Sequence, residues 1–314
     1  MKAMVTGGAG FIGSNLVDRL LAEGWDVSAV DNLSNGSLSN LDEARSNSEK
    51  KLKFYNLDVR DPSIEFLIEK ESPEVIFHLA AQADVRVSVK DPVFDGEVNV
   101  LGTIHVLEGA RKVKSPPRIV FAASGGTLYG DPDESLLPLN ESVPQVPLSP
   151  YGVSKKSAID YLACYRELHG IEFVALALAN VYGPRQDPHG EAGVVAIFAE
   201  LMLKGESPKI FGTGEQTRDF VFVDDVVDAF YKSSTRGGGL VINIGTKIET
   251  SVNQLFELMA ESVGKNIKPN YQPKRLGELF RNTLDNTRAQ MQLGWSPFTS
   301  LADGLSRTIE SIAR

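Results

Sequence analysis

The stretch Thr6-Gly7-Gly8-Ala9-Gly10-Phe11-Ile12-Gly13 decides the fold of this chain. It follows a short apolar run, residues 3–6, and leads into a helical pattern over residues 11–23. Glycines at such a turn let backbone N–H groups approach a pyrophosphate, and the helix N-terminus adds the positive end of its dipole. We expect Gly13 to let this helix lie close to a sheet. A strand, a glycine turn and a helix in this order predict a dinucleotide-binding unit.

The first half of the chain repeats the alternation of short apolar strands with helices. This pattern predicts an α/β fold with a doubly wound parallel sheet, the Rossmann fold. The predicted strands are 3–6, 26–30, 53–56, 75–79, 118–122, 173–179 and 241–244, and the predicted helices are 11–23, 62–71, 91–112, 151–169, 251–263 and 301–313. Because the pattern changes after residue 180, we predict a dinucleotide-binding domain of residues 1–180 and 221–246. A smaller, discontinuous C-terminal substrate domain is expected from residues 181–220 and 247–314.

Asp31 stands at the end of the second predicted strand, 18 residues beyond Gly13. An acid at this place binds the ribose hydroxyls of adenosine in dinucleotide-binding folds, and its charge repels a 2′-phosphate. No arginine follows it, so the sequence favours NAD over NADP. The simpler alternative is an aspartate in a solvent-exposed turn. That alternative does not explain why strand, glycine turn, helix, second strand and acid follow one another at this spacing. For Asp58 and Val59, after the third strand, contact with the adenine edge and an ordinary turn explain the pattern about equally well.

Tyr151 and Lys155 begin a predicted helix, and their spacing of four places them on one face, one turn apart. A phenol has a pKa of about 10 and is a poor base at neutral pH, but a nearby ammonium and a positively charged nicotinamide favour the phenolate. Tyr151 is then able to remove a hydroxyl proton as hydride leaves the carbon. Lys155 is expected to hold the nicotinamide ribose as well. A Tyr and a Lys four residues apart occur often by chance. The position of this pair after the fifth predicted strand is what favours a catalytic role.

Ser124 and Thr127 lie where the chain leaves the fifth predicted strand, in Ser124-Gly125-Gly126-Thr127. Ligands bind at the carboxyl ends of the strands in doubly wound folds. Either hydroxyl is placed to share the substrate proton with Tyr151, and ordinary turn chemistry explains the other. The sequence leaves this choice open.

The composition argues against several other classes of protein. The formal net charge is −9, whereas non-specific nucleic-acid binding needs a basic surface. No apolar run approaches the ~20 residues of a membrane-spanning helix, and no signal peptide precedes the first strand. We therefore expect no membrane attachment and a cytoplasmic location. The one cysteine fits a reducing compartment, and the four histidines show no metal-ligand spacing, so no metal site is predicted.

Together these motifs resemble a known family, the extended short-chain dehydrogenases/reductases. The resemblance also rests on His78-Leu79-Ala80-Ala81, Asn99, Asn180-Val181-Tyr182-Gly183-Pro184-Arg185, Arg218-Asp219-Phe220-Val221, Arg275-x-Gly277-Glu278 and Leu293-Gly294-Trp295. It covers essentially the whole chain, and within the family the motifs are most similar to those of UDP-glucose 4-epimerases. This resemblance implies NAD-dependent epimerisation at C4 of a UDP-sugar through a transient 4-keto form, with Tyr151 taking the O4 proton.

The resemblance also implies site residues. Cofactor contacts are implied at Gly7, Gly10, Phe11, Ile12, Gly13, Asp31, Asn32, Asp58, Val59, Leu79, Ala80, Ala81, Asn99, Ala122, Tyr151 and Lys155. Substrate contacts are implied at Ser124, Tyr151, Asn180, Val194, Phe211, Arg218, Arg275, Glu278 and Asn282, the two arginines on the diphosphate and Glu278 beside the uridine ribose.

Asn282 falls where the resembling epimerases have a gate beside the sugar C2 substituent. An asparagine leaves room for an N-acetyl group and offers it an amide hydrogen bond. UDP-N-acetylglucosamine is therefore expected as a substrate beside UDP-glucose and UDP-galactose. The alternative is an asparagine that faces solvent or caps a turn.

Three departures from the family pattern bear on these expectations. The serine loop carries the pair Gly125-Gly126, Ala83 stands where some epimerases have a lysine on the cofactor pyrophosphate, and Gly193 replaces an asparagine near the substrate. Two rival functions were weighed. A 4,6-dehydratase or decarboxylase of the family needs a carboxylate in the loop after the fifth strand, where this chain has none. A non-catalytic NAD sensor has no need for the Tyr–Lys pair.

Helices 91–112 and 151–169 carry apolar residues on more than one face. A helix of this kind must be covered on its outer side as well. We therefore expect a homodimer that joins two helices from each subunit, as is common in the family.

Overall fold

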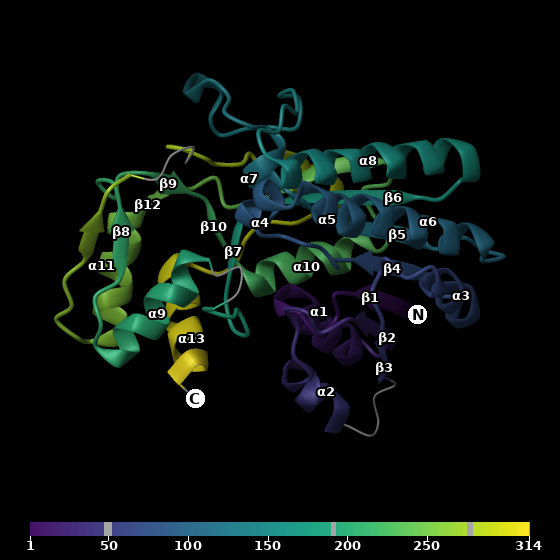
Figure 1. Cartoon of the computed structure of the whole chain (residues 1–314), viewed down its shortest axis with the longest axis horizontal. Coiled ribbons are helices and arrows are strands. Elements are labelled where there is room, and N and C mark those ends of the chain that lie inside the picture. Colours follow the sequence, from purple (N-terminus) through teal and green to yellow (C-terminus); the bar gives the residue numbers. More distant parts are fainter. Residues whose placement is uncertain (47–51, 190–192, 275–278, 314) are drawn as a thin grey trace.

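A computed structural model describes residues 1–46, 52–189, 193–274 and 279–313. Its centre is a parallel seven-stranded sheet in the order β11-β6-β5-β4-β1-β2-β3 (Figure 1). These strands are β1 (Lys2–Thr6), β2 (Asp26–Asp31), β3 (Leu52–Asn56), β4 (Val75–His78), β5 (Arg118–Ser124), β6 (Phe173–Leu178) and β11 (Leu240–Ile244). The direction of strand order reverses between β1 and β4, as in a doubly wound sheet. The predicted α/β Rossmann fold is confirmed.

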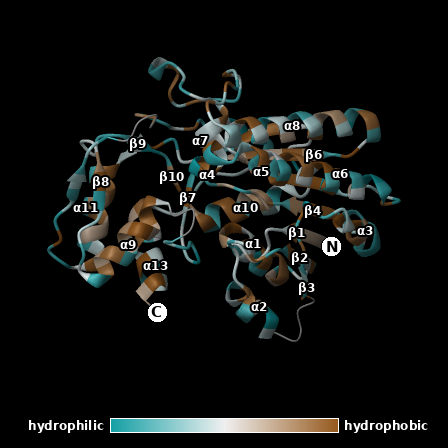
Figure 2. Ribbon diagram, viewed as in Figure 1, coloured by the Kyte–Doolittle hydropathy of each residue, from teal (hydrophilic) through white to brown (hydrophobic). Residues whose placement is uncertain are grey.

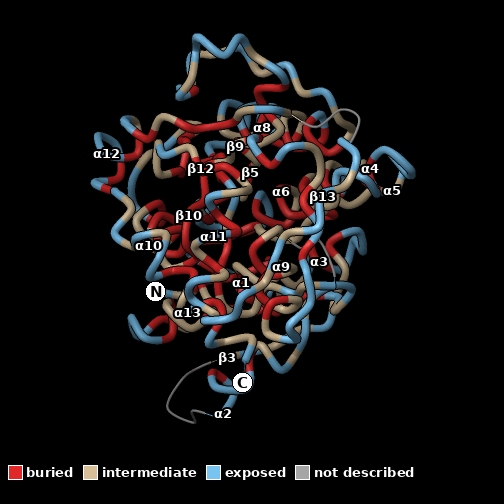
Figure 3. The backbone as a smooth tube through the Cα atoms, turned by 90° about the vertical axis from the view of Figure 1, so that its left-hand side faces the viewer, coloured by how far each residue is buried: buried red, intermediate tan, exposed pale blue. Residues whose placement is uncertain are grey.

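The central strands are apolar because helices cover both faces of the sheet. β4 and β6 are buried at every position. α1 (Phe11–Ala22) and α10 (Val223–Ser233) pack together on one face, while α3 (Ser63–Glu71), α6 (Gly102–Lys112) and α8 (Pro150–His169) cover the other. The strands are strongly hydrophobic in Figure 2, and the buried segments lie toward the middle of the molecule in Figure 3. No helix in the described part of the chain is long and apolar enough to cross a membrane.

A smaller lobe stands beside the sheet, at the left of Figure 1. Its helices α9 (Val194–Lys204), α11 (Val252–Val263) and α13 (Leu301–Ala313) contact one another. Its strand pairs are β8 (Lys209–Phe211) with β13 (Asn270–Gln272), and β9 (Thr217–Arg218) with β12 (Thr250–Ser251). The pair β7 (Asn180–Tyr182) and β10 (Phe220–Phe222) lies where the chain passes between the lobe and the sheet. The division into two domains remains a prediction, and α12 (Thr287–Leu293) contacts β11 and α10 rather than the lobe helices.

The predicted helix 91–112 is interrupted. The structure has α5 (Pro92–Gly96), a π-helical turn η2 (Glu97–Leu101) and then α6. Asp91 caps α5 by accepting a hydrogen bond from Phe94 N, and Pro92 occupies the first turn. Helix periodicity alone gives no signal for a π-helical turn, so the sequence predicted one continuous helix. The remaining elements are η1 (Leu38–Leu41), α2 (Asp42–Ser46), α4 (Val85–Lys90), α7 (Gly125–Leu128) and η3 (Glu134–Leu136).

Candidate active site

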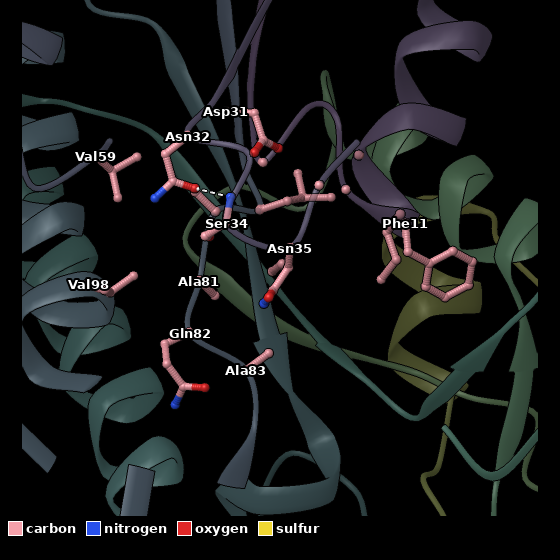
Figure 4. A pocket seen from close by; sticks show the side chains of 18 of the residues that line it. Phe11, Asp31, Asn32, Ser34, Asn35, Val59, Ala81, Gln82, Ala83 and Val98 are labelled. Carbon is pink, nitrogen blue, oxygen red and sulfur yellow. Dashed lines mark hydrogen bonds between the residues drawn. The ribbon is translucent and has the colours of Figure 1, made fainter. Parts of the chain in front are cut away.

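A cavity of about 850 Å³ opens at the carboxyl ends of the central strands. Its lining includes every predicted cofactor residue except Asn99. Figure 4 shows Asp31 and Asn32 on one side of this cavity, and Ala81, Gln82 and Ala83 along the loop that forms another side. The residues that were expected around a dinucleotide therefore surround one space.

The glycine turn allows α1 to start directly above the end of β1. A Cβ at Gly13 would lie only 2.0 Å from the carbonyl oxygen of Gly7, so only glycine permits this packing. The first turn of α1 consequently faces the cavity with Phe11 and Ile12. A helix N-terminus placed in this way suits a pyrophosphate.

Asp31 is held in a fixed position at the end of β2. It is 7% exposed, and its carboxylate accepts hydrogen bonds from Ala9 N at 3.0 Å and Leu33 N at 2.8 Å. Asn32 donates to Asp58 Oδ2 at 2.8 Å. The hydrogen bond from Arg60, together with those from Arg60 N and Asn32, lowers the pKa of Asp58 to about 2 despite its partial burial. The fixed carboxylate of Asp31 fits the hydroxyls of an adenosine ribose and opposes a 2′-phosphate, while Asp58 is paired with Arg60 beside it.

The start of α8 places Tyr151 and Lys155. Ser149 caps the helix by accepting a hydrogen bond from Gly152 N at 3.2 Å, with Pro150 in the first turn. Tyr151 is 8% exposed and Lys155 2%. The Lys155 ammonium donates to Ala122 O at 2.9 Å and lies 5.8 Å from the centre of the Tyr151 ring. The predicted pair is thus assembled, and Lys155 also bridges α8 to the end of β5.

The two candidate hydroxyls occupy different surroundings. Ser124 is the last residue of β5 and pairs with Leu178 of β6. Thr127 lies in α7, and its Oγ1 is enclosed by protein without a hydrogen-bond partner among the described residues. A Cβ at Gly152 would lie 3.3 Å from Thr127 Cβ, so Thr127 packs beside the residue that follows Tyr151. Both remain candidates for the proton-sharing role.

Asn99 lies behind the cavity wall rather than on it. It is 2% exposed; its amide nitrogen donates to Gln82 O at 2.8 Å, and its Oδ1 accepts from Gln82 N at 3.1 Å. Asn99 therefore shapes the loop after β4 that lines the cavity. Gln82 also lines the cavity but was not a predicted site residue, and its only sequence signal is its position directly after the His78–Ala81 motif.

His78 joins β4 to the helix behind it as a neutral group. Burial, with a smaller effect from the charge of Lys155, lowers the pKa of His78 to about 3. Its ring nitrogens lie 2.7 Å from Thr6 Oγ1 and 3.1 Å from Thr103 Oγ1. Thr103 donates its own proton to Asn99 O, so it accepts from His78 Nε2–H, and Nδ1 accepts from Thr6. Both ring nitrogens of His78 are therefore bonded within the fold, and the ring is neutral at neutral pH.

The predicted substrate residues lie along the side of the smaller lobe. Asn180 begins β7, Val194 begins α9, Phe211 ends β8 and Arg218 ends β9. Asn282 is 3% exposed, and its Oδ1 is enclosed without a partner among the described residues. This burial excludes the alternative of an asparagine that faces solvent. Arg275 and Glu278 lie outside the described residues.

Two of the departures from the family pattern have visible surroundings. Ala83 lines the cavity, as do Arg185, the last residue of the motif Asn180–Arg185, and Gln186, neither of which was a predicted site residue. A Cβ at Gly193 would lie 2.7 Å from Gln186 Nε2. The Gln186 amide therefore occupies the space into which a side chain at residue 193 would grow.

Known proteins resemble this chain over nearly its whole length. A family model described as GDP-mannose 4,6 dehydratase matches residues 4–308. The chain belongs to this family of extended short-chain dehydrogenases/reductases. It is 50% identical to a UDP-glucose 4-epimerase of Mycolicibacterium smegmatis, over 99% of this chain and 98% of that one. The resemblance inferred from the motifs is confirmed.

Solved structures show the same likeness. The UDP-glucose 4-epimerase of Thermotoga maritima with UDP-glucose superposes with a TM-score of 0.93 at 44% identity, covering 99% of this chain and 98% of that one. The UDP-glucose 4-epimerase of Thermus thermophilus in complex with NAD gives 0.91 at 38% identity, covering 99% of both chains. Both similarities extend over the sheet and the smaller lobe.

Proposed function

We propose that the protein is an NAD-dependent 4-epimerase of UDP-sugars that interconverts UDP-glucose and UDP-galactose. The observation that carries this proposal is the pair Tyr151 and Lys155, which faces a cavity formed by the glycine turn and by Asp31. The similarity to UDP-glucose 4-epimerases over the whole chain supports it. When bound, NAD supplies the hydride acceptor and donor for C4 of the sugar.

The residues of the chain handle the proton of the reaction. Tyr151 takes the proton of the sugar O4 as general base and returns it as general acid. The Lys155 ammonium, fixed by Ala122 O, stabilises the negative charge that develops on the phenol oxygen. Ser124 or Thr127 shares the proton with Tyr151. Between removal and return of the hydride, the 4-keto sugar must turn so that its other face meets the cofactor. The protein must therefore hold the substrate by its nucleotide and leave the sugar ring free to rotate.

In this proposal the smaller lobe binds the nucleotide part of the substrate. Asn180, Val194 and Phe211 hold the nucleotide end, and Arg218 binds the diphosphate, to which a planar guanidinium is suited. These residues begin β7, begin α9, end β8 and end β9, respectively.

A 4,6-dehydratase or a decarboxylase is the second function to consider because the family includes both kinds of enzyme. Elimination of water needs an acid beside the sugar C6 hydroxyl. The loop after β5 reads Ser124-Gly125-Gly126-Thr127 and brings no carboxylate. The loop chemistry therefore favours epimerisation.

The direct test is to load purified protein with NAD, supply UDP-galactose and measure the appearance of UDP-glucose. Epimerisation is expected in both directions, and Tyr151→Phe should lose most turnover while it retains the fold and NAD binding. A product lighter by one water would instead identify a dehydratase. Absence of turnover with a panel of nucleotide sugars would refute the proposal.

We also propose that the enzyme is a homodimer through α8 and its neighbours. Exposed apolar side chains stand on this surface, with Val153 50%, Tyr161 40% and Leu168 68% exposed on α8, and Leu101 51% exposed on η2. A second copy presents the same apolar surface and covers it by symmetry. Light scattering should give twice the mass of one chain, and Leu168→Glu with Tyr161→Glu should reduce it. A monomeric wild type would contradict this assignment.

The same proposal places the enzyme in galactose metabolism in the cytoplasm. Its one cysteine, Cys164, is exposed and unpaired, which suits a reducing compartment. Fractionation of the source cells, with detection of the protein by antibody, tests the location.

A further inference from the structure

Asp95 is a buried carboxylate that stands between the catalytic helix and the cofactor cavity. It lies in α5 and is 0% exposed. Oδ2 accepts a hydrogen bond from Ser154 Oγ at 2.6 Å, and Oδ1 accepts from Gln82 Nε2 at 2.8 Å and Asn99 Nδ2 at 3.0 Å. Both oxygens are therefore committed to neutral donors from two other parts of the chain.

The bond to Ser154 attaches Asp95 to the catalytic turn of α8. Ser154 lies between Tyr151 and Lys155 in sequence and is 6% exposed. In a helix, a bond to this residue fixes the rotation of the turn about the helix axis. The direction of the Tyr151 phenol and the Lys155 ammonium depends on that rotation.

The bonds to Gln82 and Asn99 attach Asp95 to the loop after β4. Gln82 is held at its backbone by Asn99, and its Oε1 accepts a hydrogen bond from Asp84 N at 2.7 Å. Residues 79–84 line the cavity, and Figure 4 shows Ala81, Gln82 and Ala83 on its wall. The conformation of this wall therefore depends on the same carboxylate that holds α8.

We propose that Asp95 is a positioning residue that sets the catalytic helix and the cofactor-binding loop at a fixed distance from each other. It acts through Ser154 on the proton-transfer groups and through Gln82 and Asn99 on the dinucleotide site. The effect on turnover rests on the proposed epimerase function, whereas the effect on cofactor binding does not.

Three variants separate the effect of Asp95 on α8 from its effect on the loop after β4. Asp95→Leu removes all the hydrogen bonds and keeps the same branching of heavy atoms, with a larger side chain. Asp95→Asn preserves them, because its oxygen accepts from both amides and its NH₂ donates to Ser154 Oγ. Ser154→Ala removes only the bond to α8. Glu71→Gln is the matched control, since Glu71 is another buried carboxylate, 3% exposed, but it does not line the cavity.

The first measurement is calorimetric titration of the cofactor-free protein with NAD. Asp95→Leu should bind NAD about 10-fold more weakly, because the loop loses its support. Asp95→Asn and Ser154→Ala should stay within about 3-fold of wild type. Glu71→Gln should bind normally at a temperature where it is folded. Normal NAD affinity in folded Asp95→Leu would overturn the proposal that Asp95 supports the loop after β4.

The second measurement is steady-state kinetics with UDP-galactose. Asp95→Leu and Ser154→Ala should lower kcat by ~10- to 100-fold while KM changes less than about 3-fold, since misplacement of the reacting groups affects the chemical step. Asp95→Asn should restore kcat to within several-fold. If Glu71→Gln loses as much kcat as Asp95→Leu, the loss follows from general destabilisation of the fold, and the proposal is overturned. If wild type has no epimerase activity, the proposed function fails and NAD affinity alone decides the role of Asp95.

Discussion

Leu284 packs against Gly125 so closely that a Cβ at residue 125 would lie 2.4 Å from Leu284 Cδ1. The same Cβ would lie 3.1 Å from Ala177 O and 3.2 Å from Leu178 O. A side chain at residue 125 would therefore have to displace Leu284 from the loop after β5. Leu284 follows Asn282 by two residues, and its contact gives a physical reason for Gly125, the first glycine of the pair in that loop.

Gly125→Ala should destabilise the protein by roughly 1–3 kcal/mol, because the added methyl group overpacks this junction. Gly126→Ala is the matched control, since its Cβ would meet only Ser124 Oγ at 3.9 Å. Thermal unfolding of the two variants tests this difference. Equal melting temperatures would mean that the loop and Leu284 move apart at little cost.

Ser124→Ala should lower kcat more than Thr127→Ala. Ser124 ends a paired strand, whereas Thr127 lies in the short helix α7 and its hydroxyl is enclosed by protein. Neither residue is among those that line the cavity in the described structure. Removing a group that shares the transferred proton should cost on the order of 10- to 100-fold. The reverse order of kcat values would assign the proton-sharing role to Thr127.

Asp31→Asn should relax the preference for NAD over NADP. The amide keeps an acceptor for Ala9 N or Leu33 N but removes the charge that repels a 2′-phosphate. Titration of the cofactor-free protein with both dinucleotides measures the ratio of affinities, which should shift toward NADP by about 10-fold. An unchanged ratio would place the ribose recognition elsewhere.

Asn282→Tyr should narrow the substrate range. Asn282 is buried, its Oδ1 is enclosed without a partner in the described structure, and it is not among the residues that line the cofactor cavity, so the gate role rests on the resemblance to the epimerases. Wild type should turn over UDP-N-acetylglucosamine as well as UDP-glucose, and tyrosine should lower kcat/KM for the N-acetyl sugar by at least ~10-fold through loss of space. The gate assignment fails if wild type rejects the N-acetyl sugar or if the ratio does not change.

Acid should weaken the fold through Glu71. Burial opposes its ionisation, but hydrogen bonds from Tyr55, Lys53 and Lys2 outweigh that effect and lower the pKa of Glu71 to about 2. The folded pKa lies below the ordinary value near 4.5, so the stabilisation is complete above pH 4.5 and is lost as the pH falls toward 2.

Denaturant unfolding at several pH values checks this prediction. Glu71→Gln should lose roughly 2–3 kcal/mol at neutral pH and much less near pH 2, where the wild-type carboxyl is also protonated. A constant difference across this range would show that charge is not the cause.

The fold could be predicted from the sequence because its signals are local. The glycine turn, Asp31 and the Tyr151–Lys155 spacing each occupy a short stretch, and each was found at the cavity. α9 was not predicted, because its first residues, Val194 and Val195, are β-branched and follow a glycine-rich stretch that favours loops.

The contacts that hold the site in place could not be predicted, because they join residues that are far apart in the sequence. Nothing in the pattern joins Asp95 to Ser154, 59 positions later, or Leu284 to Gly125. Asn99 was recognised as part of the site from its motif, but its contact with the loop rather than with the cavity appears only in three dimensions. A periodic pattern tells which residues face inward and not which inward residues meet.

The order of these parts along the chain has a consequence for protein synthesis. Every residue that lines the cofactor cavity lies between Gly7 and Asp187, whereas Asn282 and Leu284 come near the end. A ribosome releases the chain from its N-terminus, so the residues of the dinucleotide cavity are available for assembly while β11 and the segment with Asn282 and Leu284 have not yet been made. The nascent protein therefore has the complete lining of its cofactor cavity before the last strand of its sheet.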